Sequence, residues 1–78
     1  MIDDKELISR CQNNDRSAQK MLFEKYASKM MAICMRYCDN QEDARDLLQD
    51  GFYKIFLNIK SFRGGSRIDT WMTRVIIN

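Results

Sequence analysis

Residues 60–67 combine positive charge, an aromatic ring and flexible backbone. The cations are Lys60, Arg63 and Arg67, and the aromatic ring is that of Phe62. Cations neutralise phosphates, and an aromatic face stacks on an unpaired base, which is the chemistry that single-stranded DNA requires. Two adjacent glycines, Gly64 and Gly65, would let a base approach the backbone closely. A basic loop is common in proteins, so composition alone predicts nucleic-acid binding only weakly.

A second group of polar side chains follows helical spacing between residues 43 and 57. Away from the apolar positions lie Asp43, Asp46, Gln49, Asp50 and Tyr53, and Leu57 continues this face. One interpretation is a solvated acidic face whose first carboxylates stabilise a helix N-terminus. The other is a docking surface on which the carboxylates and the Gln49 amide bind Arg or Lys side chains of a partner helix. Helical spacing leaves both interpretations open.

The charge is divided between the two parts of the chain. Residues 1–51 carry ten acidic and eight basic groups, a balance of −2, whereas residues 52–78 carry five basic groups and one acidic group, a balance of +4. Asp39 to Asp50 alone has five acids and one cation. The division predicts a polyanion such as nucleic acid at the basic end and a different partner at the acidic segment.

Residue types that carry catalysis or bind metals are scarce. The chain has no histidine, and its three cysteines include Cys34 and Cys38, four residues apart. These do not make a usual zinc ligand set, and they fit better as small buried hydrophobic residues. A redox or metal enzyme using them would require perturbed thiols, which buried cysteines seldom have. We therefore expect no enzyme activity, no metal and no cofactor.

Length and composition restrict the fold class. Seventy-eight residues, 45% hydrophobic and 31% charged, suffice for one small domain. The absence of proline and the presence of only three glycines disfavour β-turns and predict an all-α fold. No apolar run reaches the roughly 20 residues that span a bilayer. An acidic rather than signal-like N-terminus and an odd number of cysteines predict a cytoplasmic protein without membrane insertion.

Apolar spacing and polar breaks predict a compact bundle of about four helices. The helices should cover residues 4–12, 15–38, 40–59 and 67–78 approximately. Expected N-caps are Asn14 or Asp15 for the second helix, Asp39 with Glu42 for the third, and Ser66 with Asp69 for the fourth. Helical spacing places the methionines, Tyr26, Tyr37 and Trp71 in the core, and for Trp71 stacking on DNA is the alternative.

Three runs of residues at linked spacing carry a family resemblance. They are Asp43–Phe52 (DARDLLQDGF), Ser61–Ser66 (SFRGGS) and Thr70–Asn78 (TWMTRVIIN), and Leu22–Tyr26 precedes them. Together they resemble region 2 of the extracytoplasmic-function (ECF) sigma factors, which direct transcription initiation by bacterial RNA polymerase. The resemblance covers residues 4–78 and implies packed helices with two functional surfaces.

The resemblance assigns a role to each surface. It implies that Asp46, Gln49 and Asp50 bind the clamp helices of the largest catalytic subunit of core polymerase, and Tyr53 shares their face. It also implies that the loop and the last helix recognise the melted −10 promoter element on the non-template strand and capture a flipped base, through Phe62, Arg63, Ser66 and Asn78. Charge and position add further candidate DNA contacts, which are Lys60, Arg67, Trp71 and Arg74. An anti-sigma factor is a further expected partner, because such factors commonly cover these surfaces.

Two residues depart from the family pattern. Gly51 replaces a larger residue, which should lower helix stability by about 1 kcal/mol relative to alanine, and Met72 replaces the commoner leucine. Family members carry a second, helix-turn-helix domain that reads the −35 element, so residues 1–78 are expected to be a fragment, one region 2 domain of a longer chain. The rival hypothesis is an anti-sigma-binding or decoy module that does not read DNA, although such a module would not need Phe62 among cations.

Overall fold

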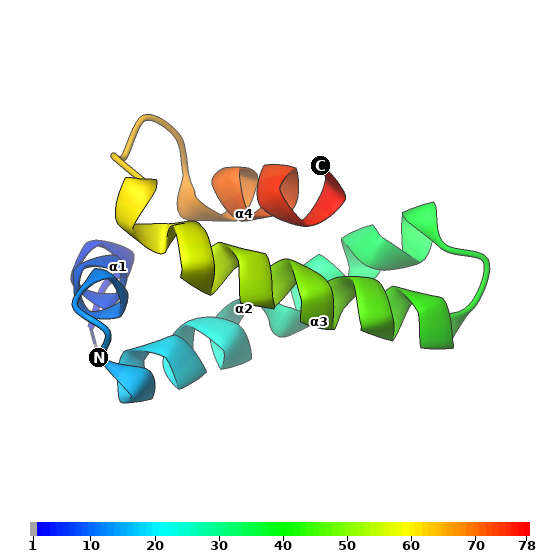
Figure 1. Cartoon of the computed structure of the whole chain (residues 1–78), viewed down its shortest axis with the longest axis horizontal. Coiled ribbons are helices and arrows are strands. Elements are labelled where there is room, and N and C mark those ends of the chain that lie inside the picture. The colour runs from blue at the N-terminus through cyan, green and yellow to red at the C-terminus, as the bar shows by residue number, and fades with distance from the viewer. Residues whose placement is uncertain (1) are drawn as a thin grey trace.

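The structure, a computed structural model, describes residues 2–78. In this range the elements are α1 (Asp4–Gln12), α2 (Arg16–Tyr37), α3 (Gln41–Asn58), the short 3-10 helix η1 (Ile59–Ser61) and α4 (Ile68–Ile77). Figure 1 shows α2 and α3 running in opposite directions, α4 along one side of α3, and α1 beside the end of α3 where η1 begins. The all-α four-helix prediction is confirmed. Residues 2–78 contain no helix of the length and apolar content needed to cross a bilayer.

Three of the helices begin at side-chain caps. Asp3, Asp15 and Asn40 accept hydrogen bonds from the backbone N–H three residues later, at 2.9, 3.2 and 2.8 Å. The prediction of Asp39 as a cap is wrong. The backbone of Cys38 is extended (φ −122°, ψ 152°), so α2 ends at Tyr37. The N-cap of α3 is Asn40, one residue after the predicted Asp39.

The predicted Ser66–Asp69 cap of α4 is also wrong. Arg67 occupies the N-cap position, and no side chain of residues 2–78 caps this helix. The Ser66 hydroxyl donates weakly to the Arg67 carbonyl at 3.3 Å. Asp69 cannot reach back to a cap position, because its carboxylate is buried against Lys29 of α2.

The core is made by one side of each helix. Its buried apolar residues are Leu7, Cys11, Ala18, Leu22, Met30, Cys34, Ala44, Phe52, Ile55, Ile59, Ile68, Met72 and Ile76. The prediction that Tyr37 and all methionines are core is wrong, because Tyr37 is 65% exposed and Met21 and Met35 are more than one-third exposed. The apolar face of α2 is wider than the area that its neighbours cover, so its edges stay in solvent.

Gly51 is the point of closest approach between α3 and α4. A Cβ atom at this position would lie 2.5 Å from Cγ1 and 2.9 Å from Cγ2 of the buried Ile76. Atoms cannot approach so closely in a packed core. The expectation that glycine only weakens α3 is therefore corrected, because alanine would not fit here.

The cysteines match the expectation of structural residues. Cys11 and Cys34 are buried and Cys38 is half-buried, all with free thiols. Burial raises the pKa of the Cys11 and Cys34 thiols, which keeps them protonated and weakly reactive. Within the described residues, no three His, Cys, Asp or Glu side chains gather as metal ligands would.

Candidate functional site

The segment between α3 and α4 is held in place by α1. Its first part is the η1 turn, anchored by Ile59, which is 1% exposed. The Gln12 Nε2 of α1 donates to the carbonyls of Ile59 and Phe62, both at 3.0 Å. Gly64 then adopts φ +79°, which glycine tolerates without strain. These constraints fix residues 59–67, called the loop below, although only its beginning is helical.

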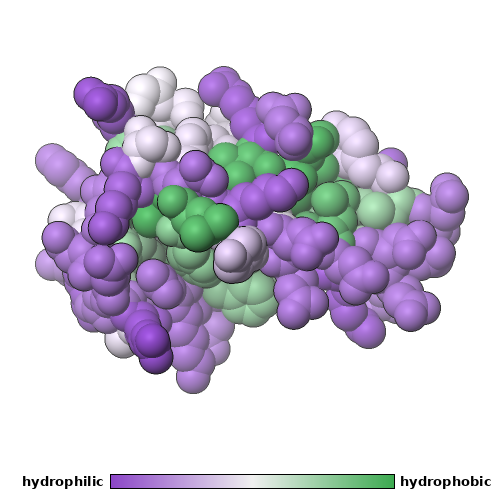
Figure 2. Space-filling model, in the orientation of Figure 1, coloured by the Kyte–Doolittle hydropathy of each residue, from purple (hydrophilic) through white to green (hydrophobic). Residues whose placement is uncertain are grey.

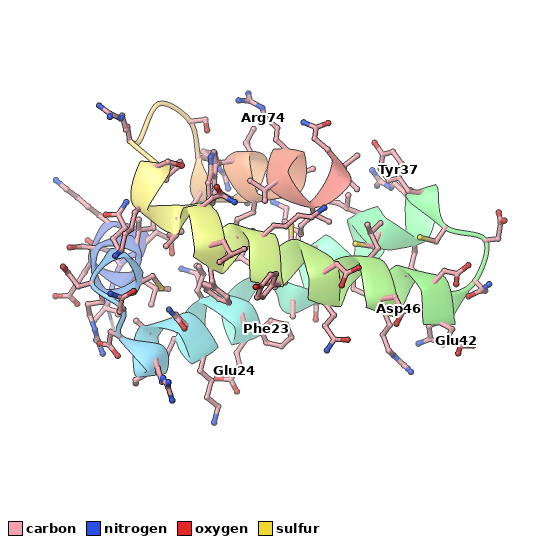
Figure 3. All side chains as sticks on the ribbon, in the orientation of Figure 1. Phe23, Glu24, Tyr37, Glu42, Asp46 and Arg74 are labelled. Carbon is pink, nitrogen blue, oxygen red and sulfur yellow. The ribbon has the colours of Figure 1, made fainter. Side chains whose placement is uncertain are left out.

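A hollow of about 270 Å³ lies between the loop and α4. The Phe62 and Trp71 rings pack beside it with centroids 5.4 Å apart, tilted by 59°. The hollow is lined by Ser61, Phe62, Arg63, Gly65, Ser66, Trp71 and Arg74. Figure 3 shows Arg74 pointing from α4 away from α3. Aromatic edges, hydroxyls and two guanidinium groups thus meet in one open recess, called the first hollow below.

The charge around the first hollow is positive. Among the described residues no carboxylate lines it. The nearest acid in sequence, Asp69, is 4% exposed, and its Oδ2 pairs with the Lys29 Nζ at 2.5 Å and with the Arg67 Nη2 at 3.1 Å. The hydrogen bond from Lys29, with the charge of Arg67, lowers the pKa of Asp69 despite its burial. The negative charge of Asp69 is therefore compensated by Lys29 and Arg67. The remaining charge around the first hollow is positive and favours anions.

Several of the predicted DNA-binding residues lie outside the first hollow. Lys60 is exposed on η1, and Arg67 is directed to Asp69. Asn78 is the C-cap of α4, and its N–H donates to the carbonyl of Arg74, one turn earlier, at 2.9 Å. Trp71, expected in the core with stacking on DNA as the alternative, is half-buried and lines the first hollow.

The structure adds residues that sequence reasoning missed. Ser61 lines the first hollow and lies inside the segment already singled out by its charge, while Gly65, which the sequence did single out, lines it as well. Gln12 holds the loop from 47 and 50 residues away. No spacing signal in the sequence connects Gln12 to the loop, so only the fold reveals this contact.

The acidic face of α3 is exposed to solvent. Asp46, Gln49, Asp50 and Tyr53 are all exposed, Tyr53 by 68%, and Leu57 follows with 63%. No ion pair within residues 2–78 involves Asp46 or Asp50. Figure 2 shows hydrophobic surface along the middle of the α3–α4 face, bordered by hydrophilic side chains. Free carboxylates next to exposed apolar side chains are a composition that suits a protein partner.

Comparison with known proteins identifies the family. Residues 22–78, which include the loop, α3 and α4, match the family model "Sigma-70 region 2". The chain belongs to the sigma-70 region 2 family. Its relatives include the RNA polymerase sigma-H factor of Pseudomonas aeruginosa, 33% identical over 75 residues, which are 96% of this chain and 39% of that protein. The ECF sigma-E factors of Haemophilus influenzae and Escherichia coli K12 are 34% and 32% identical over 77 residues, 99% of this chain and 40% of theirs.

A solved structure agrees with this assignment. The NMR structure of an engineered region 2 of sigmaE in complex with GTAAAA superposes with a TM-score of 0.89 and 28% identity, covering 99% of this chain and 80% of that one. The resemblance to ECF region 2 is confirmed, and sigma factors are not enzymes, as expected. This sigma region 2 chain spans about two fifths of the length of its curated relatives. The α1 helix lies outside the residues matched by the family model.

Proposed function

We propose that this sigma region 2 domain recognises a −10 promoter element as single-stranded DNA and holds one flipped base of the non-template strand in the first hollow. The observation that carries this proposal is the recess itself, where Phe62, Trp71, Arg63 and Arg74 meet around hydroxyl groups. Rings provide stacking and the guanidinium groups bind phosphates. Support comes from the sigmaE region 2 neighbour, which was solved with GTAAAA.

The other contacts of this proposal lie around the recess. Lys60 and Asn78 are exposed beside it and would contact the backbone of the strand, and Arg67 would add charge. Melting of the promoter would then follow from capture, because a base held outside the stack cannot pair. Trapping the unpaired strand in this way requires no catalytic group.

The second part of the proposal concerns the partner of α3. We infer that Asp46, Gln49, Asp50 and Tyr53 bind the clamp helices of the largest subunit of core RNA polymerase. Unpaired exposed carboxylates attract a basic helix, and the adjoining Leu57 adds apolar area. An anti-sigma factor that covers this face would compete with polymerase. The chain would then act in the cytoplasm, as one domain of a longer sigma factor.

Binding of single-stranded oligonucleotides, followed by fluorescence anisotropy, tests the DNA proposal. The panel should include GTAAAA and shuffled sequences of the same composition. Phe62→Ala should weaken binding of the preferred sequence by about 1–3 kcal/mol, the usual contribution of one base–aromatic stack. Tyr37→Ala is the matched control, because it removes an aromatic ring that is 65% exposed outside the first hollow.

Two outcomes would contradict the proposal. Unchanged affinity and sequence preference in Phe62→Ala would mean that the loop is not the reader. Absence of any DNA binding by the wild-type domain, together with binding to core polymerase or an anti-sigma factor, would favour the rival interaction module.

A further inference from the structure

A second hollow lies on the other side of the loop, against α1. Its volume is about 320 Å³, and it is lined by Lys5, Ile8, Ser9, Gln12, Phe62, Arg63 and Gly64. Four of these residues follow helical spacing along α1, so one face of that helix forms a wall. None of the four was among the residues that sequence reasoning assigned to DNA.

The two hollows adjoin each other. Phe62 and Arg63 line both, while Gly64 lines the second hollow and Gly65 the first. Phe62 and Arg63 thus form a wall that the two hollows share. A chain molecule that occupies the first hollow and continues past Arg63 would reach the second hollow next.

The chemistry of the second hollow suits a nucleotide. Ile8 and Phe62 provide apolar surface for a base, and Lys5 and Arg63 provide charge for its phosphates. Two polar atoms are available for the edge of a base. Within residues 2–78, the Ser9 hydroxyl makes no hydrogen bond and Gln12 Oε1 accepts none, although Gln12 Nε2 is engaged with the loop.

The charged side chains among the described residues that line the second hollow are both basic, Lys5 and Arg63. No Asp or Glu of the described residues lines the second hollow. Asp4 is turned toward α2, where Lys25 and Tyr26 both bind its carboxylate. Burial disfavours its ionised form, but the hydrogen bonds from Lys25 and Tyr26 lower the pKa of Asp4 overall, so its charge is compensated.

We propose that the second hollow holds the base of the nucleotide next to the flipped one, on the same DNA strand. The proposal rests on the function proposed above, because the first hollow must hold a base for the strand to continue into the second. It makes α1 part of the DNA-binding surface. Region 2 of this chain would then read two neighbouring bases, on opposite sides of Phe62.

Oligonucleotides that lack single bases test the proposal. The strand that binds best is synthesised with one abasic site at each position in turn, and the affinities of wild type, Ser9→Trp and Ser9→Ala are compared. Ser9 is exposed, so either substitution should leave the fold intact, and the indole would fill the second hollow. Wild type should lose affinity at two adjacent positions. Ser9→Trp should bind the intact strand about five-fold or more weakly, the lower end of the range for one stacked base.

The decisive result is the coupling between protein and oligonucleotide. The affinity of Ser9→Trp should not change when the base that would occupy the second hollow is removed, and should still fall when the base in the first hollow is removed. The affinities of Ser9→Ala should match those of wild type for every oligonucleotide. If wild type loses affinity at only one abasic position and Ser9→Trp binds as tightly as wild type, the proposal for the second hollow is overturned, while the proposal for the first hollow stands. Equal weakening by Ser9→Trp for every oligonucleotide would also overturn it. If no position is sensitive even in wild type, the function proposed above fails as well.

A charge variant gives an independent measurement. Lys5→Ala should reduce the slope of log affinity against log salt concentration by about 0.7, the value for one phosphate contact on a single strand. Lys20→Ala is the matched control, because Lys20 is an exposed cation that lines neither hollow. Equal slopes for Lys5→Ala and wild type would contradict the proposed path over α1.

Discussion

Replacing Gly51 by alanine should lower the free energy of unfolding, although alanine is the better helix former. The helix preference alone would add about 0.8–1.0 kcal/mol. The new methyl group, however, would lie 2.5 Å from Cγ1 and 2.9 Å from Cγ2 of Ile76. Rotating the Ile76 side chain does not relieve the clash, because its Cβ would also lie 3.0 Å away. Overpacking costs about 1–3 kcal/mol, and α4 would have to move, so we expect a net loss of about 1–2 kcal/mol.

Urea unfolding followed by circular dichroism measures this change in a double-mutant cycle. The cycle compares wild type, Gly51→Ala, Ile76→Ala and the double variant, in sucrose so that the cavity variant stays folded. Ile76→Ala removes both clashing Cγ atoms and leaves only the 3.0 Å approach to the Cβ atom, so adding Gly51→Ala should cost clearly less in this background than in wild type. A Gly51→Ala protein more stable than wild type would refute the reasoning. An equal loss in both backgrounds would show that Ile76 is not the obstacle.

Three further predictions concern the two surfaces and the buried carboxylate. Gln49→Ala with Asp50→Lys should abolish capture of core polymerase in a pull-down while helical content is kept; undiminished capture would exclude this face as the docking site. Arg67→Ala should weaken binding to all single-stranded oligonucleotides alike and reduce the salt slope by about 0.7, so a loss confined to one sequence would contradict a phosphate contact. The pKa of Asp69 is lowered in the folded state by Lys29, so its stabilising effect is complete above the unfolded pKa of about 3.9 and is lost as pH falls further. Unfolding between pH 5 and pH 3 should show a smaller loss of stability for Asp69→Asn than for wild type.

Much of the fold followed from local sequence features. The apolar positions of α3 recur at three- and four-residue spacing, and Ala44, Phe52, Ile55 and Ile59 are all buried. Breaks at Asn13–Asn14 and Asp39–Asn40 set the helix ends to within a residue or two. Periodicity reports which side of a helix is apolar, and in a small bundle that side has to be buried.

The remaining features depend on contacts between distant residues. Tyr37 and Met35 fit the apolar face of α2 but lie beyond the area that α3 and α4 cover. Arg67 ends the basic loop, yet it pairs with the buried carboxylate of Asp69 and does not line the first hollow. The role of Gly51 is set by Ile76, 25 residues later. A one-dimensional pattern does not contain such pairs, so the fold class could be predicted and the composition of the site only in part.

The two proposed surfaces are connected by a continuous run of helical backbone. The acidic face lies on α3, and α3 continues directly into η1, whose Ile59 is buried and whose end carries Phe62. Gln12 fixes the end of this run from α1, and the close contact of Gly51 with Ile76 fixes α4 against its middle. A packed junction of this kind does not deform gradually. If α3 binds polymerase and the loop binds the promoter strand, the angle between the two partners is therefore set by the domain core rather than by a flexible linker.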